Sequence, residues 1–142
     1  MTIGRDASPA AVYREWQRCM STQDYEGMRR VVDFAGYTEI CLGLTGWTTG
    51  YEVALGNYMK NMMTPWEGRE TTEEDVVEGT GKVTVRSRIT ATHVGEFLGV
   101  APTRRRITWD NISIVEVEDG RIVGQWAQPD LWGIYQQLVA PQ

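Results

Sequence analysis

The stretch from Arg106 to Asp130 reads RITWDNISIVEVEDGRIVGQWAQPD. It contains two runs rich in β-branched and aromatic residues, 106–118 and 121–128. Asp119-Gly120 lies between them, and this dipeptide is typical of a two-residue hairpin turn. The stretch therefore predicts two long antiparallel strands joined by a tight turn.

More strands are expected on the N-terminal side of this hairpin. Residues 83–94 are rich in β-branched residues and predict another long strand. Gly79 and Gly81 mark a turn before it, and the acidic segment 72–78 opens a further strand. After the hairpin, Pro129 ends the last strand, and apolar residues at helical spacing predict a short closing helix.

The first part of the chain predicts helices. Ser8 is a suitable N-cap and Pro9 a suitable first residue for a helix that runs to about residue 20. Asp24 can cap a second, shorter helix, and a third begins near Tyr51. One early strand, 36–44, precedes a turn at 46–50.

The order of these elements indicates the fold class. Helices come first and antiparallel strands follow, which is typical of an α+β fold. We expect a single domain over residues 1–142, with about three N-terminal helices packed on a strongly curved antiparallel sheet and a short C-terminal helix. A bent sheet covered by helices leaves a hollow that suits a ligand.

Composition excludes several function classes. The net charge is −5, whereas nucleic-acid binders usually carry a basic face. No apolar run reaches the roughly 18 residues that span a bilayer, and no secretory signal is visible, so we expect a cytoplasmic protein without membrane contact. His93 is the single histidine and there are two cysteines, so no metal site is expected.

Large aromatic side chains are abundant. The chain has six Trp and six Tyr, which either fill the core or line a pocket for a hydrophobic or aromatic small molecule. Trp16 belongs to the apolar stripe of the first helix, where Tyr13 is a further candidate for the pocket wall. On the strand 106–118 both faces mix polar and apolar residues, so the direction of Trp109 stays open and a bulge is conceivable.

Asp130 is the most informative carboxylate. If the last strand stays extended through Pro129, Asp130 shares one face with Trp126 and Gln128. A carboxylate held against Trp in an apolar hollow suits the taking and returning of a proton. The alternative is that Asp130 only caps the helix beginning at Leu131.

Other candidates are His93, Glu39 and Asn57. His93 lies on the apolar side of the strand 83–94, where it either orients a catalytic group or is a satisfied core residue. Glu39 points into the hollow or lies on a solvent-facing edge strand. Asn57 lies one helical turn from Asn61, and these amides either reach a ligand or face water.

Three segments of the second half resemble a known family. Residues 91–103 read ATHVGEFLGVAPT, residues 112–123 read ISIVEVEDGRIV, and residues 133–138 read GIYQQL. With Trp126 and Asp130, they resemble the SnoaL-like polyketide cyclase family, within the nuclear transport factor 2-like cone-fold superfamily. The resemblance is close over about residues 76–138. It implies a cone-shaped α+β barrel that pairs as a homodimer through its open sheet face, and chemistry without a cofactor.

The resemblance also implies an activity. In these cyclases of secondary metabolism, an aspartate at the end of the last strand is the acid and base of an intramolecular aldol ring closure. Asp130 matches that position, and His93 matches the histidine of the family's Thr-His-x-Gly motif. We therefore expect Asp130 and His93 as catalytic residues. The expected substrate-binding residues are Tyr13, Trp16, Glu39, Asn57, Trp109, Trp126 and Gln128.

Departures from the family pattern keep other functions open. Glu39 and Glu67 lie in segments where members often carry a His or Asp and a Pro-Asp pair. A related cone-fold isomerase, epoxide hydrolase or cofactor-free hydroxylase is one alternative, and epoxide opening would need Glu39 or Glu67 as a second acid. The other alternative is a non-catalytic small-molecule-binding or dimerisation module, in which Asp130 is a plain helix cap.

Overall fold

The first two helices begin where the sequence predicts them. The computed structural model describes residues 4–142. In α1 (Pro9–Thr22) the Ser8 hydroxyl accepts a hydrogen bond from the Ala11 N–H over 3.2 Å. In α2 (Tyr25–Val31) the Asp24 carboxylate accepts one from the Gly27 N–H over 2.8 Å. Both caps are therefore confirmed.

The turn predicted at 46–50 was wrong. Residues 46–49 form β2 (Gly46–Thr49), which pairs antiparallel with β1 (Thr38–Cys41) and places Trp47 opposite Ile40. β2 is an edge strand, and only Thr48 of its residues is buried, so it shows little apolar alternation. α3 (Tyr51–Tyr58) follows and continues into a π-helical turn, η1 (Met59–Met63).

The rest of the chain confirms the long strands and the closing helix. The hairpin turns at Gly79–Gly81 and Asp119-Gly120 are present. The strand predicted to open at 72 begins earlier, at Trp66. The elements are β3 (Trp66–Gly79), β4 (Lys82–His93), β5 (Arg106–Glu118), β6 (Arg121–Pro129) and α4 (Leu131–Val139).

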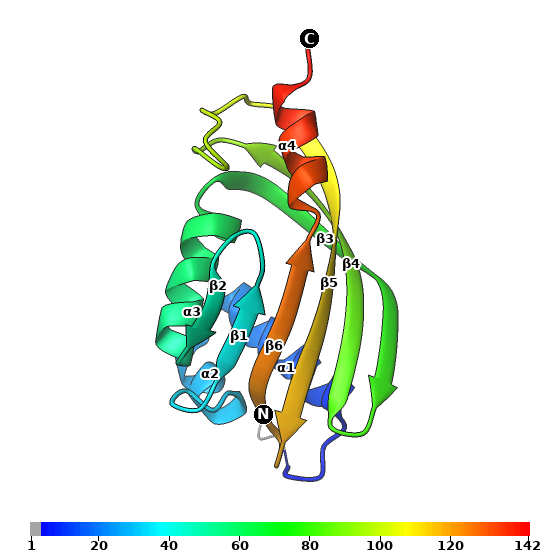
Figure 1. The fold of residues 1–142 in the computed structure, drawn as a ribbon. Coiled ribbons are helices and arrows are strands. Elements are labelled where there is room, and N and C mark those ends of the chain that lie inside the picture. Colours follow the sequence, from blue (N-terminus) through cyan, green and yellow to red (C-terminus); the bar gives the residue numbers. More distant parts are fainter. Residues whose placement is uncertain (1–3) are drawn as a thin grey trace.

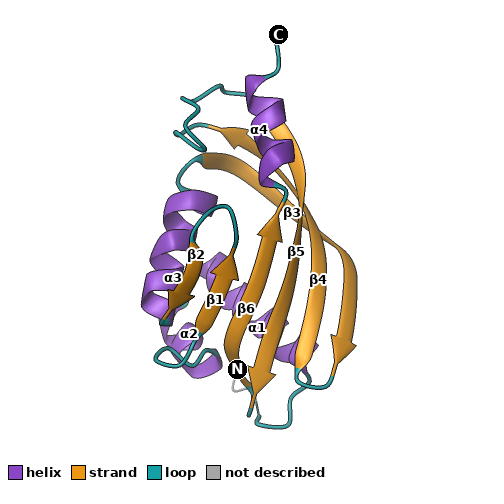
Figure 2. Ribbon diagram, viewed as in Figure 1, coloured by secondary structure: helices purple, strands orange, loops and turns teal. Residues whose placement is uncertain are grey.

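One curved sheet holds the six strands in the order β2-β1-β6-β5-β4-β3. Neighbouring strands are antiparallel except β1 and β6, which are parallel, so the sheet is mixed rather than antiparallel as expected. β2 and β3 are the two edge strands and do not pair with each other, so the predicted barrel is open. Helices α1, α2 and α3 lie behind the sheet and α4 lies at one end of it (Figures 1 and 2). The α+β class is confirmed.

An extra residue in β6 changes which side chains face the helices. Glu116 of β5 pairs with Gly124, but Val117 pairs with Ile122, so Val123 has no partner. Such a bulge reverses the inside–outside alternation of every residue beyond it.

The bulge explains why the predicted faces of β6 were wrong. Gln125 and Ala127 line the inner side, whereas Trp126 and Gln128 are exposed on the outer face. On β5 the alternation is unbroken against β4, so Trp109 points inward and is buried. A bulge depends on two paired strands, and no pattern in β6 alone reveals it.

Candidate functional site

A cavity of about 140 Å³ lies between the inner face of the sheet and the helices. Its floor comes from five strands and includes Glu39, Gln125, Ser113, Asn111, Ser87 and Arg69. Its roof comes from α1, α3 and η1 and includes Tyr13, Trp16, Tyr51, Asn57, Tyr58 and Met62. The mix of aromatic walls with a few polar groups is typical of a small-molecule site.

Glu39 contributes the single carboxylate among the described residues that line this cavity. The Tyr37 hydroxyl donates a hydrogen bond to Glu39 Oε1 over 2.6 Å, and the Gln125 amide donates to the same oxygen over 2.9 Å. Burial, together with the Glu39 charge, raises the pKa of Tyr37 well above its usual range, so this hydroxyl stays a donor. Both donors hold one carboxylate oxygen, which leaves Oε2 for a ligand.

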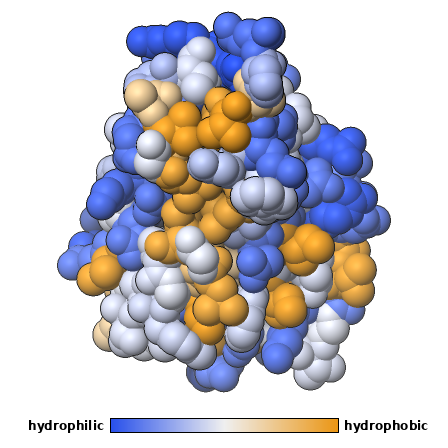
Figure 3. All heavy atoms as spheres, turned by 45° about the horizontal axis from the view of Figure 1, so that its top comes forward, coloured by the Kyte–Doolittle hydropathy of each residue, from blue (hydrophilic) through white to orange (hydrophobic). Residues whose placement is uncertain are grey.

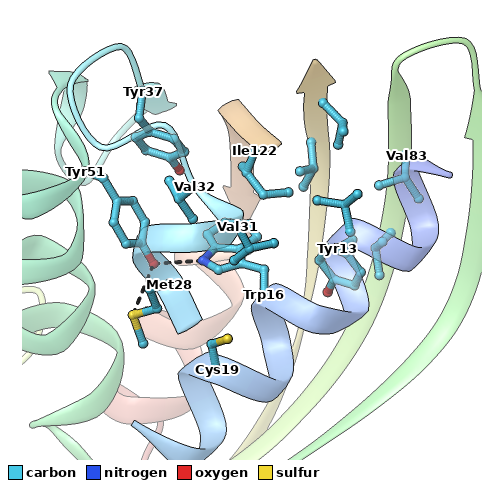
Figure 4. Close-up of a cluster of buried hydrophobic side chains, with 14 of the residues drawn as sticks. Tyr13, Trp16, Cys19, Met28, Val31, Val32, Tyr37, Tyr51, Val83 and Ile122 are labelled. Atoms are coloured by element: carbon cyan, nitrogen blue, oxygen red, sulfur yellow. Dashed lines mark hydrogen bonds between the residues drawn. The ribbon is translucent and has the colours of Figure 1, made fainter. Parts of the chain in front are cut away.

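Tyr51 and Trp16 form a polar pair in the roof. The Trp16 Nε1–H donates to the Tyr51 hydroxyl oxygen over 2.7 Å, and the same oxygen lies 4.0 Å from the Met28 sulfur (Figure 4). The Met20 sulfur is nearer, at 3.2 Å. Burial raises the pKa of Tyr51 to about 12. The hydrogen bond from Trp16 lowers this pKa, but the effect of burial is larger. The hydroxyl is therefore neutral at neutral pH. Because a methionine thioether is a weak acceptor, the proton of the Tyr51 hydroxyl remains available to a ligand oxygen.

Tyr13 and Asn57 complete the polar groups of the roof. Burial, followed by the nearby Glu73 charge, raises the pKa of Tyr13 to about 12, so its hydroxyl is also a neutral donor. The Asn57 amide donates to the Thr48 hydroxyl over 3.4 Å. The structure thus brings Tyr13, Trp16, Glu39 and Asn57 together around one cavity, and their role in binding a substrate stays a prediction.

Asp130 lies elsewhere. Its side chain is exposed at the start of α4, where Oδ1 accepts a hydrogen bond from the Gly133 N–H over 2.9 Å. It does not line the cavity, and neither do Trp126 and Gln128. The prediction that these residues point into the hollow was therefore wrong, and the alternative of a helix cap describes Asp130.

Trp109 belongs to a second buried apolar cluster, and His93 is buried beside it with its ring centre 5.3 Å from that of Trp66. Both lie outside the cavity lining. The Thr103 N–H donates to His93 Nδ1 over 3.1 Å, so the ring proton is on Nε2. Burial lowers the pKa of His93 and keeps the ring neutral. Trp109 packs on Trp66 with ring centroids 4.7 Å apart. The geometry gives both residues a place in the core rather than in the pocket wall.

Sequence reasoning missed several polar residues of the cavity, among them Tyr51, Gln125 and Arg69. Gln125 was assigned to the other face because the bulge at Val123 was not foreseen. Arg69 was overlooked because β3 begins at Trp66, before the predicted strand. Within residues 4–142, no group of three or more His, Cys, Asp or Glu side chains is placed to hold a metal ion, and no helix is long and apolar enough to cross a membrane.

A family model and a curated relative match this chain. The family model described as SnoaL-like polyketide cyclase matches residues 10–138. A curated relative, the aklanonic acid methyl ester cyclase AcmA of Streptomyces galilaeus, is 39% identical over 59 residues. That match covers 40% of this chain and 41% of the relative, less than half the length of either.

Solved structures share the fold. A candidate SnoaL-like polyketide cyclase from Jannaschia sp. CCS1 is 20% identical with a TM-score of 0.80, covering 98% of this chain and all (100%) of that one. IdmH from Streptomyces antibioticus, a candidate polyketide cyclase, is 24% identical with a TM-score of 0.79, covering 93% of this chain and 99% of its own. At these identities the likeness concerns the fold. Because the family model spans almost the whole chain, this protein belongs to the SnoaL-like polyketide cyclase family.

Proposed function

We propose that the protein is a cofactor-independent cyclase that closes a ring by an intramolecular aldol reaction in a polyketide-type substrate. The observation that carries the proposal is the placement of Glu39. Its carboxylate is the one acidic group on the described cavity lining, and two donors fix one of its oxygens. A positioned base in an aromatic pocket is what proton removal beside a carbonyl requires.

Glu39 starts and ends the proposed reaction. Its Oε2 removes a proton from a carbon next to a carbonyl, and the resulting enolate carbon attacks a second carbonyl carbon of the same molecule. One carbon–carbon bond forms, and the attacked oxygen becomes an alkoxide. Protonated Glu39 returns the proton to this alkoxide, so the step consumes no co-reactant. The cavity contributes by holding the two carbon centres close together.

Tyr51 and Tyr13 stabilise the developing negative charge. Both hydroxyls are neutral because burial raises their pKa to about 12, and both line the cavity. A hydrogen bond to the enolate oxygen is stronger in the transition state than in the substrate, which accelerates the step. The bond from Trp16 makes the Tyr51 hydroxyl a better donor.

The aldol proposal accounts for the cavity better than epoxide opening. The sequence offered Glu39 or Glu67 as the second acid that epoxide opening needs. With Glu39 as the first acidic group of the cavity, Glu67 would have to be the second, but it is exposed on β3 and does not line the cavity. The test is conversion of aklanonic acid, offered both as the free acid and as the methyl ester named for the curated relative, by the purified protein and by its Glu39→Gln variant. Conversion by the parent protein and not by the variant supports the proposal. Equal conversion by both would refute the role of Glu39.

We also propose that two copies pair through the outer face of the sheet. This face exposes Ile112 (45%), Ile114 (39%) and Trp126 (45%), and Ile114 pairs directly with Trp126 between β5 and β6. Figure 3 shows hydrophobic side chains gathered along the middle of the face that carries α4, with hydrophilic ones on both sides. Exposed apolar side chains in contact with one another favour a covered surface.

A further inference from the structure

Arg69 is the one positive charge among the described residues that line the cavity. The other lining residues are uncharged except Glu39, so the cavity holds one acidic and one basic side chain. Arg69 is half-buried, and no carboxylate of residues 4–142 lies within 4.0 Å of it. A guanidinium without an acidic partner in a ligand cavity suggests that a ligand supplies the partner.

A bulge in β3 directs Arg69 toward the cavity. Glu67 pairs with Thr92 and Glu70 with Thr90, so β3 has one residue more than β4 at this point. Gly68, immediately before Arg69, has a φ of 60°, a conformation that favours glycine. Bulges beside binding sites commonly redirect a side chain, and here the bulge places Arg69 on the cavity side of a mostly exposed strand.

Contacts to the helical roof then fix the guanidinium. Arg69 Nη1 donates to the Tyr58 hydroxyl over 2.9 Å and to the Met62 carbonyl oxygen over 3.0 Å. The guanidinium also lies 5.6 Å from the centre of the Tyr58 ring. The Met62 carbonyl belongs to the end of η1, where carbonyls lack helical partners, so the arginine satisfies it.

These contacts use only one of the three nitrogens. Nε and Nη2 make no hydrogen bond to any other residue in 4–142. Their N–H groups form the planar fork that binds the two oxygens of a carboxylate side by side. Lysine would offer a point charge and no such fork.

Glu39 and Arg69 lie at opposite ends of the cavity floor. Glu39 is on β1 and Arg69 on β3, with β6, β5 and β4 between them. Adjacent strands are about 4.8 Å apart, so four strand spacings give about 19 Å along the curved sheet. A ligand that spans the floor therefore meets a base at one end and a cation at the other.

We propose that the substrate carries a free carboxylate, which Arg69 binds through Nε and Nη2 at the end of the cavity opposite Glu39. This rests on the proposed function in placing the reacting carbon at the Glu39 end. Arg69 is then a specificity-determining residue that selects the acid over its neutral ester or amide. It also orients the chain-like substrate so that the carbon acid reaches Glu39.

The test is calorimetric titration with a matched probe pair, anthraquinone-2-carboxylate and anthraquinone-2-carboxamide. We expect the parent protein to bind the carboxylate at least about tenfold more tightly, since a charge-assisted bidentate bond is worth about that much. The Arg69→Met variant should bind both probes equally. Arg69→Lys retains the charge without the fork, so it should retain only part of the preference.

Two further variants distinguish a direct contact with Arg69 from a general effect of charge and from the aldol chemistry. Arg106 pairs with Glu70 on the outer face beside Gly68, so Arg106→Met removes a neighbouring charge outside the cavity and should leave the preference unchanged. Glu39→Gln should also retain it, because binding needs no turnover. A failed aldol assay with an intact preference would refute the proposed reaction alone.

Three results would overturn the role of Arg69. The first is a parent protein that binds the carboxylate no better than the carboxamide, or does not bind it. The second is an Arg69→Met variant that melts like the parent and retains the preference. The third is an equal loss in Arg106→Met, which would indicate a general charge effect.

Discussion

Glu39 and Gln125 lie opposite each other where β1 and β6 run parallel, and the Gln125 amide donates to Glu39 Oε1 over 2.9 Å. The two residues are 86 positions apart in the chain. Their contact joins the first strand to the last and sets the direction of the carboxylate. Gln125 can only reach Glu39 because the bulge at Val123 turns it inward.

Replacing Glu39 tests the proposed base. Glu39→Gln retains an amide oxygen that can accept from Tyr37 and Gln125, so the fold should persist. The variant cannot take up the substrate proton, and we expect ring closure to slow by about 10² to 10⁴. Product formation from aklanonic acid or its methyl ester, whichever the parent protein converts, is followed by chromatography and measures this loss.

Asp130 supplies the matched carboxylate control. Asp130→Asn still caps α4, because asparagine is as good an N-cap as aspartate, and should leave the rate unchanged. Asp130→Ala should lower the free energy of unfolding by about 0.5–2 kcal/mol, measured with urea, through loss of the bond from Gly133. A large loss in the rate of ring closure in Asp130→Asn would indicate that Asp130 is the catalytic residue after all.

The Tyr51 hydroxyl should matter for both stability and rate. Tyr51→Phe leaves the buried Trp16 Nε1–H without its acceptor, which should cost about 1–3 kcal/mol in urea unfolding. Ring closure should slow as well, since an oxygen donor is lost. Tyr25→Phe is the comparison, because Tyr25 is 52% exposed and its change should be within about 0.5 kcal/mol. Equal stabilities for the two variants would contradict the roof geometry.

The outer sheet face should control the oligomeric state. Ile114→Glu places a carboxylate beside Trp126 in both copies, so we expect sedimentation equilibrium to report a dimer for the parent protein and a monomer for the variant. Val53→Glu changes an even more exposed apolar residue, on α3, and should leave the dimer intact. A parent protein that sediments as a monomer would refute the proposed dimer.

His93 should make stability depend on pH. Burial lowers its pKa below the ordinary 6.5, so the unfolded chain binds the proton more readily than the folded one. The stabilisation is complete above pH 6.5 and is lost as the pH falls through the lower, folded value. His93→Asn retains an acceptor near the Thr103 N–H but cannot titrate. Its loss of stability between about pH 7.5 and 5.5, measured by urea unfolding, should be smaller than that of the parent. Identical pH profiles would contradict this.

Local signals in the sequence determined most of the elements. Ser8 and Asp24 predicted the starts of α1 and α2, and Asp119-Gly120 predicted the turn between β5 and β6. On β4 the alternation placed Ser87 and His93 on the buried side, as observed. These features depend on a residue and its near neighbours, which is why a single sequence contains them.

The cavity was decided by contacts between distant segments. The bulge at Val123 exists only against β5, yet because of it Gln125 rather than Trp126 lies on the inner face. The parallel pairing with β6 brings Glu39 to Gln125, and the bulge against β4 brings Arg69 to the cavity. The sequence by itself therefore determined the α+β class, the helix caps and the aromatic lining from α1. Only the tertiary structure decided which charged groups face the ligand, because one inserted residue reverses a strand's faces and its cause lies in the partner strand.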